Sequence, residues 1–322
     1  MIQKLKLLTI ILFSLIFSLI LCELALRITY QFVTNYDIEM WKYAKELKIK
    51  NQNTVINHTH VINSSAKLQK VEIKTNNLGQ RDKYIDNKVL ENYDRTFIVL
   101  GSSIALGWGV QSKNTFSEVL NNYSVSDKKK WLFVNGGIGN YNTERYVNNF
   151  LENWADLKFS DIIIHFFVND TELLISTKTN FLYQHTYIGV QIWKLLNTFK
   201  SHLKKDNIND YYFKLYSENS EGFKIAKLNL QKIKNFCDIK NINCHLVLMP
   251  DLNQFDKNKF TFIREKVKEL TDELGIDFLD LYKAFDTQNF NNISLLNKYN
   301  DPHPNSLAHK IIADNIFNYL NK

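Results

Sequence analysis

The chain has 322 residues, 45% of them hydrophobic and 13% aromatic, which is enough to bury a sizeable core. Its formal net charge of +7 allows nucleic acid or an anionic membrane as a partner. The lysines are scattered, however, and the densest run is Lys128 to Lys130. We therefore predict solvated helix faces and no nucleic-acid partner.

The N-terminus carries an uncharged apolar run from Leu7 to Cys22, between Lys6 and Glu23. The run is slightly shorter than the ~20 residues that span a bilayer, but flanking apolar residues and the long side chain of Lys6 extend it. No small-x-small cleavage motif follows, so we predict an uncleaved transmembrane anchor over residues 1–30. Because basic residues precede the run, we expect a single-pass inner-membrane protein whose C-terminal domain lies in the periplasm or otherwise outside the cytoplasm.

Residues 31–92 are expected to form a membrane-proximal stem. The segment YDIEMWKYAKELKI has the spacing of an amphipathic helix. The alternation in KVEIKTN, within residues 54–80, indicates a small β segment.

Strand and helix patterns alternate over residues 93–322. The segments TFIVL, WLFVN, DIIIHFFV, CHLVLM and IDFLDL have strand patterns, and TFSEVLNNY, TERYVNNFLENW, FTFIREKVKELTDEL and SLAHKIIADNIFNYL have helix patterns. This alternation predicts an α/β fold, a doubly wound, flavodoxin-like parallel sheet with helices on both faces. Residues 171–222 break the rhythm and are rich in aromatic residues and lysines, so we predict an inserted helical cap there.

Polar residues follow the strands of this sheet. Ser102 and Ser103 come after the first strand, residues 135–140 after the second, and Asn169 with Asp170 after the third. The segment NDPHPN, at 300–305, precedes the last helix. Sites in such sheets lie at the carboxyl ends of the strands, so these segments are expected to converge.

The converging residues are of the types that ester cleavage needs. A serine hydroxyl becomes nucleophilic when a histidine takes its proton, and a carboxylate fixes the tautomer of that histidine. The tetrahedral oxyanion needs donors already in place, such as backbone N–H groups and an Asn side chain. The sequence therefore predicts a serine-dependent site at this edge of the sheet.

Four blocks in this order resemble the SGNH (GDSL-like) hydrolase family, in its membrane-anchored bacterial form. They are TNNLGQRD with RTFIVLGSSIALGWGVQSKNTF, then VNGGIGNYNTE, FFVNDTE and DPHPNSLAHKIIAD. The resemblance covers roughly residues 75 to 320. It implies the fold of that family and ester hydrolysis through an acyl-enzyme, with no metal or cofactor.

The resemblance also implies roles for individual residues. Ser103 would be the nucleophile, His303 the base and Asp301 the group that orients it. The oxyanion hole would consist of the N–H of Ser103, the N–H of Gly139 and the side chain of Asn169. Asn140 is an alternative to Gly139, because the length of this loop is ambiguous.

Two positions depart from the family pattern. Ser102 stands where the family usually has Asp, which leaves the nucleophile in place but can set the loop differently. The acidic partner often lies three residues before the histidine, where this chain has Asn300, whereas Asp301 lies two residues before it.

Several residues have simpler interpretations. His58 and His60 could chelate a metal, but no third ligand is in view, so no metal site is predicted. Trp108 is expected to pack beside the site and Asp170 to be a solvated loop carboxylate. Cys237 and Cys244 could pair in an oxidising compartment or remain two buried thiols.

These features predict an anchored, extracytoplasmic serine esterase. It would remove a short acyl group, such as acetyl, from an envelope glycan or lipid. Two alternatives stay open: an O-acyltransferase that acts on an envelope polysaccharide, and a non-catalytic glycan-binding member of the fold. Ser102 in place of Asp motivates the second alternative.

Overall fold

The computed structural model describes residues 2–174, 180–203, 208–254, 260–286, 292–297 and 301–322. The chain divides into two compact units. The first comprises residues 1–43 and 176–206, and the second comprises residues 44–175 and 207–322.

The first unit is helical and has a small core of its own. Its helices are α1 (Ile2–Phe32), α2 (Tyr36–Glu46), α7 (Phe181–His185) and α8 (Tyr187–Leu203), of which α2 ends just inside the second unit. Ile38, Tyr187 and Val190 are buried together, with Leu26 and Trp41 among the side chains packed on them. α1 contains a stretch from Gln3 to Phe32 that is long and apolar enough to cross a membrane, with a mean hydropathy of 2.6.

The second unit is built on a five-stranded parallel sheet. Its strands are β5 (Arg95–Gly101), β6 (Trp131–Gly137), β7 (Asp161–Phe167), β8 (Asn243–Met249) and β9 (Asp277–Asp280), in the order β6-β5-β7-β8-β9. With strands numbered along the chain this is the order 2-1-3-4-5 of flavodoxin-like folds. The predicted doubly wound parallel sheet is thereby confirmed.

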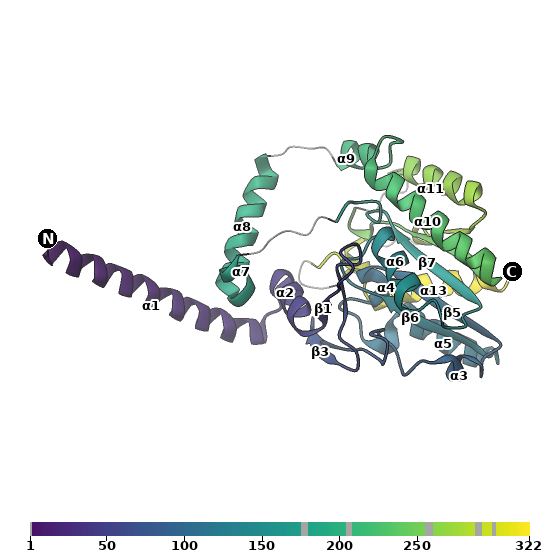
Figure 1. The fold of residues 1–322 in the computed structure, drawn as a ribbon, viewed down its shortest axis with the longest axis horizontal. Helices are drawn as coiled ribbons and strands as arrows, with labels where there is room; N and C mark the ends of the chain where they lie inside the picture. The colour runs from purple at the N-terminus through teal and green to yellow at the C-terminus, as the bar shows by residue number, and fades with distance from the viewer. Residues whose placement is uncertain (1, 175–179, 204–207, 255–259, 287–291, 298–300) are drawn as a thin grey trace. The chain divides into compact units, whose positions relative to one another are not determined.

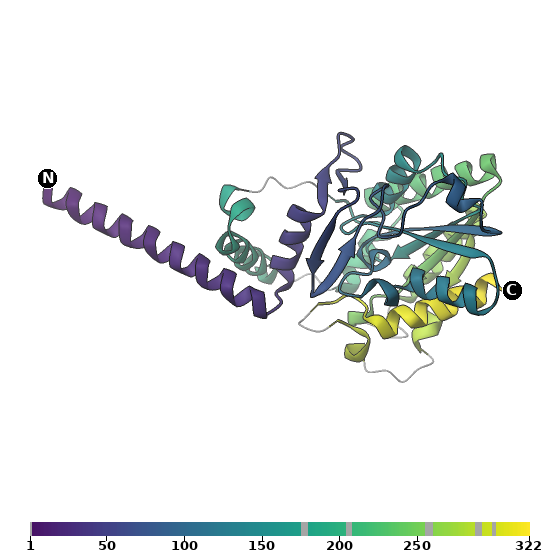
Figure 2. The same ribbon diagram turned by 90° about the horizontal axis from the view of Figure 1, so that it is seen from below.

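Helices cover both faces of this sheet, because alternate side chains of each strand point to opposite sides. Ile98 and Leu100 pack on one side, and Phe97 and Val99 on the other. The first side is covered by α6 (Thr143–Asn153), α10 (Glu221–Lys240) and α11 (Thr261–Leu274). The second side is covered by α5 (Phe116–Ser126), α12 (Tyr282–Asp286) and α13 (Ser306–Leu320), the last drawn in yellow in Figure 2.

Shorter elements complete the second unit. Two antiparallel pairs precede the sheet, β1 (Lys48–Lys50) with β2 (His58–His60) and β3 (Ser65–Leu68) with β4 (Val71–Lys74). The remaining elements are α3 (Asn87–Leu90), α4 (Ser103–Leu106), α9 (Ile208–Leu215) and the 3-10 turns η1 (Ser112–Asn114), η2 (Leu252–Gln254) and η3 (Asn292–Leu295). Cys237 and Cys244 are both free, buried thiols.

Candidate active site

Strand β5 places Ser103 at the carboxyl edge of the sheet. The strand ends at Gly101, and Ser103 is the first residue of the short helix α4. A Cβ at Gly101 would lie 2.9 Å from Ala105 Cβ and 3.0 Å from the His165 carbonyl oxygen, so a larger residue would fit here only if these neighbours shifted. Because Ser103 begins a helix, its N–H has no acceptor within that helix.

His303 reaches Ser103 from the loop before α13. Its Nε2 lies 2.7 Å from Ser103 Oγ, and its Nδ1 lies 2.6 Å from Asp301 Oδ1. The loop is fixed by its backbone, since Asn297 N–H donates to the His303 carbonyl and His303 N–H donates to Asp301 Oδ1. Asn305 then caps α13 by accepting from the N–H groups of Leu307 and Ala308.

Trp108, which the sequence predicted to pack beside the site, also makes a hydrogen bond there that the sequence did not predict. The indole is 1% exposed, and its Nε1 donates to Asp301 Oδ2 at 3.0 Å. Asp301 therefore accepts on both carboxylate oxygens, from His303 on one and Trp108 on the other. Such a donor fixes the plane of the carboxylate.

Asn169 follows β7 and is oriented from α9. The hydroxyl of Tyr212 donates to Asn169 Oδ1, and the Tyr216 hydroxyl donates to the Val168 carbonyl at 2.8 Å. Tyr212 is buried against Phe260, with ring centroids 4.8 Å apart. Because the Asn169 oxygen is occupied, its Nδ2 is the atom left to donate into the site.

The loop that carries Gly139 is held by strand β2. His58 Nε2 lies 3.0 Å from the Gly139 carbonyl, and the Tyr141 hydroxyl donates to the His58 carbonyl. Burial, with the nearby Lys48 charge, lowers the pKa of His58 to about 2, so the imidazole is neutral and donates from Nε2. Asn140 adopts a left-handed backbone conformation, with φ of 70°, at the bend of this loop. His58 therefore supports the loop.

A cavity of about 160 Å³ opens beside Ser103 and His303. Its lining also includes Asn169 at the end of β7 and the Pro250 to Asn253 turn after β8. Within the described residues, Gly139 and Asn140 are not part of this lining. The cavity thus joins three of the four converging segments that the sequence predicted.

Other sequence interpretations have different outcomes. The interpretation of Asp170 as a solvated carboxylate is wrong: it is 2% exposed, and its Oδ2 accepts from the Phe167 N–H, which closes the turn after β7. Burial raises its pKa well above the usual range. Ser102 is buried and makes no side-chain cap to α4. Asn300 lies outside the described residues.

No metal cluster of three His, Cys, Asp or Glu residues occurs within the described ranges. His60, the second histidine of the HTH stretch, has Nδ1 2.8 Å from the Gly79 carbonyl. A larger cavity of about 330 Å³ lies near Arg81, but the guanidinium already donates to the carbonyls of Leu106, Gly107 and Val110. We therefore assign the candidate chemistry to the smaller cavity.

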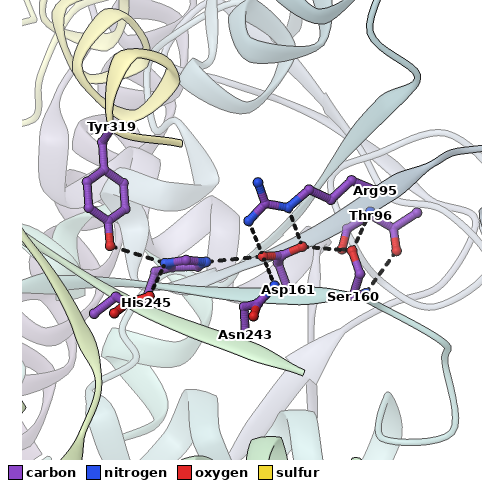
Figure 3. Close-up of polar contacts among 8 residues, drawn as sticks. Arg95, Thr96, Ser160, Asp161, Asn243, His245 and Tyr319 are labelled. Carbon is purple, nitrogen blue, oxygen red and sulfur yellow. Dashed lines mark hydrogen bonds and ion pairs between the residues drawn. The ribbon is translucent and has the colours of Figure 1, made fainter. Parts of the chain in front are cut away.

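A second His–carboxylate pair lies at the opposite edge of the sheet (Figure 3). Asp161, at the start of β7, accepts from Arg95 at 2.6 and 2.9 Å and from Ser160 at 2.7 Å. His245 Nε2 lies 3.1 Å from Asp161 Oδ1, and its Nδ1 lies 3.2 Å from the Tyr319 hydroxyl. This cluster ties β5, β7, β8 and α13 together.

No protein-family model matches the sequence. No curated protein matches it either. Among solved structures, the fold is similar to that of an esterase from Pseudoalteromonas sp., with 13% identity and a TM-score of 0.44 over 71% of this chain and all of the other. It is similar to an acetyl xylan esterase, with 12% identity and a TM-score of 0.43 over 70% of this chain and 99% of the other.

A lipase/acylhydrolase from Enterococcus faecalis is similar to the same extent, with 14% identity and a TM-score of 0.43. That alignment covers 70% of this chain and 95% of the other. Similarities at these scores say nothing about activity. The proposed activity therefore rests on the geometry of the site.

Proposed function

We propose that the protein is a serine esterase of the SGNH (GDSL-like) type, anchored in a membrane by α1. The observation that carries this proposal is the 2.7 Å contact between Ser103 Oγ and His303 Nε2, backed by the 2.6 Å contact between His303 Nδ1 and Asp301. A serine, a histidine and a carboxylate in this relay, beside a cavity, form the arrangement that acyl transfer requires. A binding protein without catalysis needs no such relay.

The reaction would proceed in two displacements. His303 Nε2 takes the proton of Ser103 as Oγ attacks the ester carbonyl, and Asp301 stabilises the imidazolium. The collapsing tetrahedral intermediate releases the alcohol, which receives the proton from His303. A water molecule, deprotonated by His303, then attacks the acyl carbonyl; the bond to Ser103 Oγ breaks, the carboxylic acid is released, and His303 returns the proton to Oγ.

The negative oxygen of the tetrahedral intermediate needs donors that are already in place. We assign this role to the Ser103 N–H, the Nδ2 of Asn169 and the Gly139 N–H. Ser103 and Asn169 line the same cavity, and each has a donor directed by local structure. The assignment of Gly139 rests on the family resemblance alone.

The size of the cavity favours a short acyl group. Its volume of about 160 Å³ is near that of an apolar protein cavity that holds one benzene molecule. Asp251 and Asn253 give its lining polar groups suited to a hydroxylated alcohol portion. We therefore propose acetyl or a similarly short ester on an envelope glycan or lipid as the substrate class, with the catalytic unit outside the cytoplasm.

The proposal is tested by ester hydrolysis with the full chain in detergent. Wild type is expected to hydrolyse nitrophenyl acetate faster than long-chain nitrophenyl esters. Ser103→Ala and His303→Ala should each lose at least about 10⁴-fold in kcat, as for other triads whose members act as a unit. Ser112→Ala, at an exposed serine of η1, is the matched control and should keep the wild-type rate. A folded wild type no faster than Ser103→Ala would contradict the proposal.

A further inference from the structure

Helix α8 is amphipathic; Tyr187 and Val190 lie in the small core of the first unit, and a polar flank contacts α2 and the residue before it. Lys194 Nζ lies 2.5 Å from Asp37 Oδ2 of α2, and Gln191 Nε2 lies 3.5 Å from Asn35 Oδ1. Ile192, Leu195, Leu196 and Phe199 share another face, because they recur at helical spacing. Leu195 is 69% and Phe199 is 68% exposed. This set of four residues is called the apolar face of α8 below.

The start of α8 is fastened to α1 at the level where the apolar run ends. Both carboxylate oxygens of Glu23 accept at 3.0 Å, one from the N–H of Tyr187 and one from that of Ile188. Arg27 Nε donates to the same carboxylate at 2.7 Å and neutralises it. A carboxylate at a helix N-terminus is further stabilised by the helix dipole. The contact fixes α8 to one depth along α1.

That depth corresponds to the boundary of a bilayer. The uncharged run from Leu7 to Cys22 is roughly 24 Å long as a helix, at 1.5 Å per residue, and flanking apolar residues extend it toward the ~30 Å hydrocarbon core. Glu23 is the first charged residue after the run. α8 leaves α1 at a wide angle instead of running along it (Figure 1), so a spanning α1 leaves α8 near the membrane plane.

Aromatic side chains gather at the same level. Trp41 packs edge-on against Tyr187 at 5.5 Å, and Tyr183 packs against Trp193 at 5.1 Å between ring centroids. The Trp41 indole also donates to the Tyr183 carbonyl. Trp and Tyr are the residues enriched where hydrocarbon meets headgroups.

We propose that α8 is an interfacial helix whose apolar face is buried among lipid acyl chains at the membrane surface. This rests on the proposed anchoring by α1. An amphipathic helix with a large apolar face and a polar flank lies in the interface by burying that face in the headgroup and acyl boundary. Lipid is the occupant because α8 begins beside Glu23, where the uncharged run of the proposed span ends, and the apolar residues of both the span and this face are exposed.

The experiment measures depth by fluorescence quenching in the full chain. Single cysteines are introduced in a Cys22→Ser background and labelled with a nitrobenzoxadiazole fluorophore; Cys237 and Cys244 are buried. The protein is reconstituted in phosphatidylcholine vesicles that contain doxyl-labelled phosphatidylcholine. Test sites are Leu196→Cys and Phe199→Cys. Thr198→Cys is the matched control, about 200° from Leu196 around a helix of 3.6 residues per turn.

Two more sites calibrate the measurement. Phe13→Cys, in α1, reports lipid, and Ile239→Cys, 82% exposed in the second unit, reports water. We expect the labels at 196 and 199 to be quenched by the doxyl lipid several-fold more strongly than the label at 198. The label at 239 should respond to aqueous iodide alone.

Three outcomes would overturn the proposal. Labels at 196 and 198 that iodide quenches equally would place α8 in water. A label at 196 shielded from both quenchers would place a protein on the apolar face. Absence of lipid quenching at position 13 would remove the anchoring premise. Hydrolysis of nitrophenyl acetate by the same samples is measured in parallel, so a failure of the membrane inference is separable from a failure of the proposed esterase.

Discussion

The two edges of the parallel sheet each carry a histidine beside a buried aspartate, and only one edge has the features of a catalytic site. At the amino edge, the Asp161 carboxylate accepts hydrogen bonds from Arg95, Ser160 and Asn243. The second nitrogen of His245 faces the hydroxyl of Tyr319 (Figure 3). At the carboxyl edge, the second nitrogen of His303 faces Ser103, which lines a cavity.

From this difference we expect catalysis at the carboxyl edge and a structural role for the pair at the amino edge. At the amino edge, hydrogen-bond donors surround the Asp161 carboxylate, and their bonds hold β5, β7 and β8 together. The pair at the carboxyl edge leaves one imidazole nitrogen in contact with the Ser103 hydroxyl, which lines a cavity. Parallel strands bring loop residues together at their carboxyl ends, where side chains are free of the ladder.

The sharpest test of this comparison replaces each of the two histidines by glutamine in a separate variant. His303→Gln should lose about 10⁴-fold or more in kcat, because it removes the proton acceptor of Ser103. His245→Gln should keep kcat within about twofold and lower only stability. Hydrolysis of nitrophenyl acetate and thermal unfolding, measured on both variants, give the comparison. Equal losses of activity would remove the distinction between the edges.

A second test concerns the amino edge alone. Asp161→Asn should lower the free energy of unfolding by about 2–3 kcal/mol, less than is typical of a fully buried pair, because Arg95 is partly hydrated. The activity of the folded fraction should stay unchanged. Urea unfolding at neutral pH measures the loss, and an unchanged midpoint would contradict it.

The same carboxylate predicts a pH dependence of stability. Burial alone raises the pKa of Asp161, but hydrogen bonds from His245, Arg95 and Ser160 outweigh it and hold the pKa below its usual range. A lowered folded-state pKa contributes stability that is present above the unfolded value of ~3.9 and is lost as pH falls below it. Wild type should therefore lose stability more steeply than Asp161→Asn below about pH 4, as urea midpoints across that range would measure.

At the carboxyl edge, Asn169 and Tyr212 should act as donor and orienting residue. Asn169→Ala should lower kcat by about 10²–10³-fold, as for removal of one oxyanion donor. Tyr212→Phe should lower kcat by about tenfold with little change in KM, because the amide remains but is less well oriented. Tyr216→Phe, whose hydroxyl contacts the Val168 carbonyl, is the matched control for a purely structural effect. A loss confined to KM would argue against the orienting role.

Trp108 provides a further test at the carboxyl edge. Trp108→Phe keeps an aromatic ring and removes the donor to Asp301 Oδ2. A hydrogen bond to a charged group is worth about 1.5–3 kcal/mol, so kcat should fall by roughly 10–100-fold. If the variant matches wild type in kcat while its thermal midpoint falls, the indole is a packing residue only.

Much of the fold could be predicted from the sequence because its signals are local. The runs FIVL, LFVN and DIIIHFFV are apolar throughout, as expected for strands buried on both faces, and each leads into polar residues at its end. Ser103, Asp301 and His303 could be predicted to lie together because each belongs to a short block with a recognisable neighbour pattern, and the three side chains are in contact.

The supporting residues could not be predicted in the same way. Trp108 meets Asp301 across 193 positions, and His58 meets Gly139 across 81, and no local pattern signals either contact. Tyr187 meets Glu23 across 164 positions, so α8 shares a unit with α1 although its sequence offers only an aromatic, amphipathic pattern. Asp170 looked solvated because it follows a strand, but the turn that buries it is set by its own hydrogen bond to Phe167.

The most direct test of the account is covalent labelling with diethyl p-nitrophenyl phosphate. Attack by Ser103 Oγ would form the Oγ–P bond and release p-nitrophenolate, and peptide mass spectrometry locates the adduct. We predict one diethylphosphoryl group on Ser103, matched by lost esterase activity, none in Ser103→Ala and far slower labelling in His303→Ala. An adduct on another residue, or unlabelled Ser103 in an enzyme that the reagent has inactivated, would contradict the assignment of Ser103 as the nucleophile.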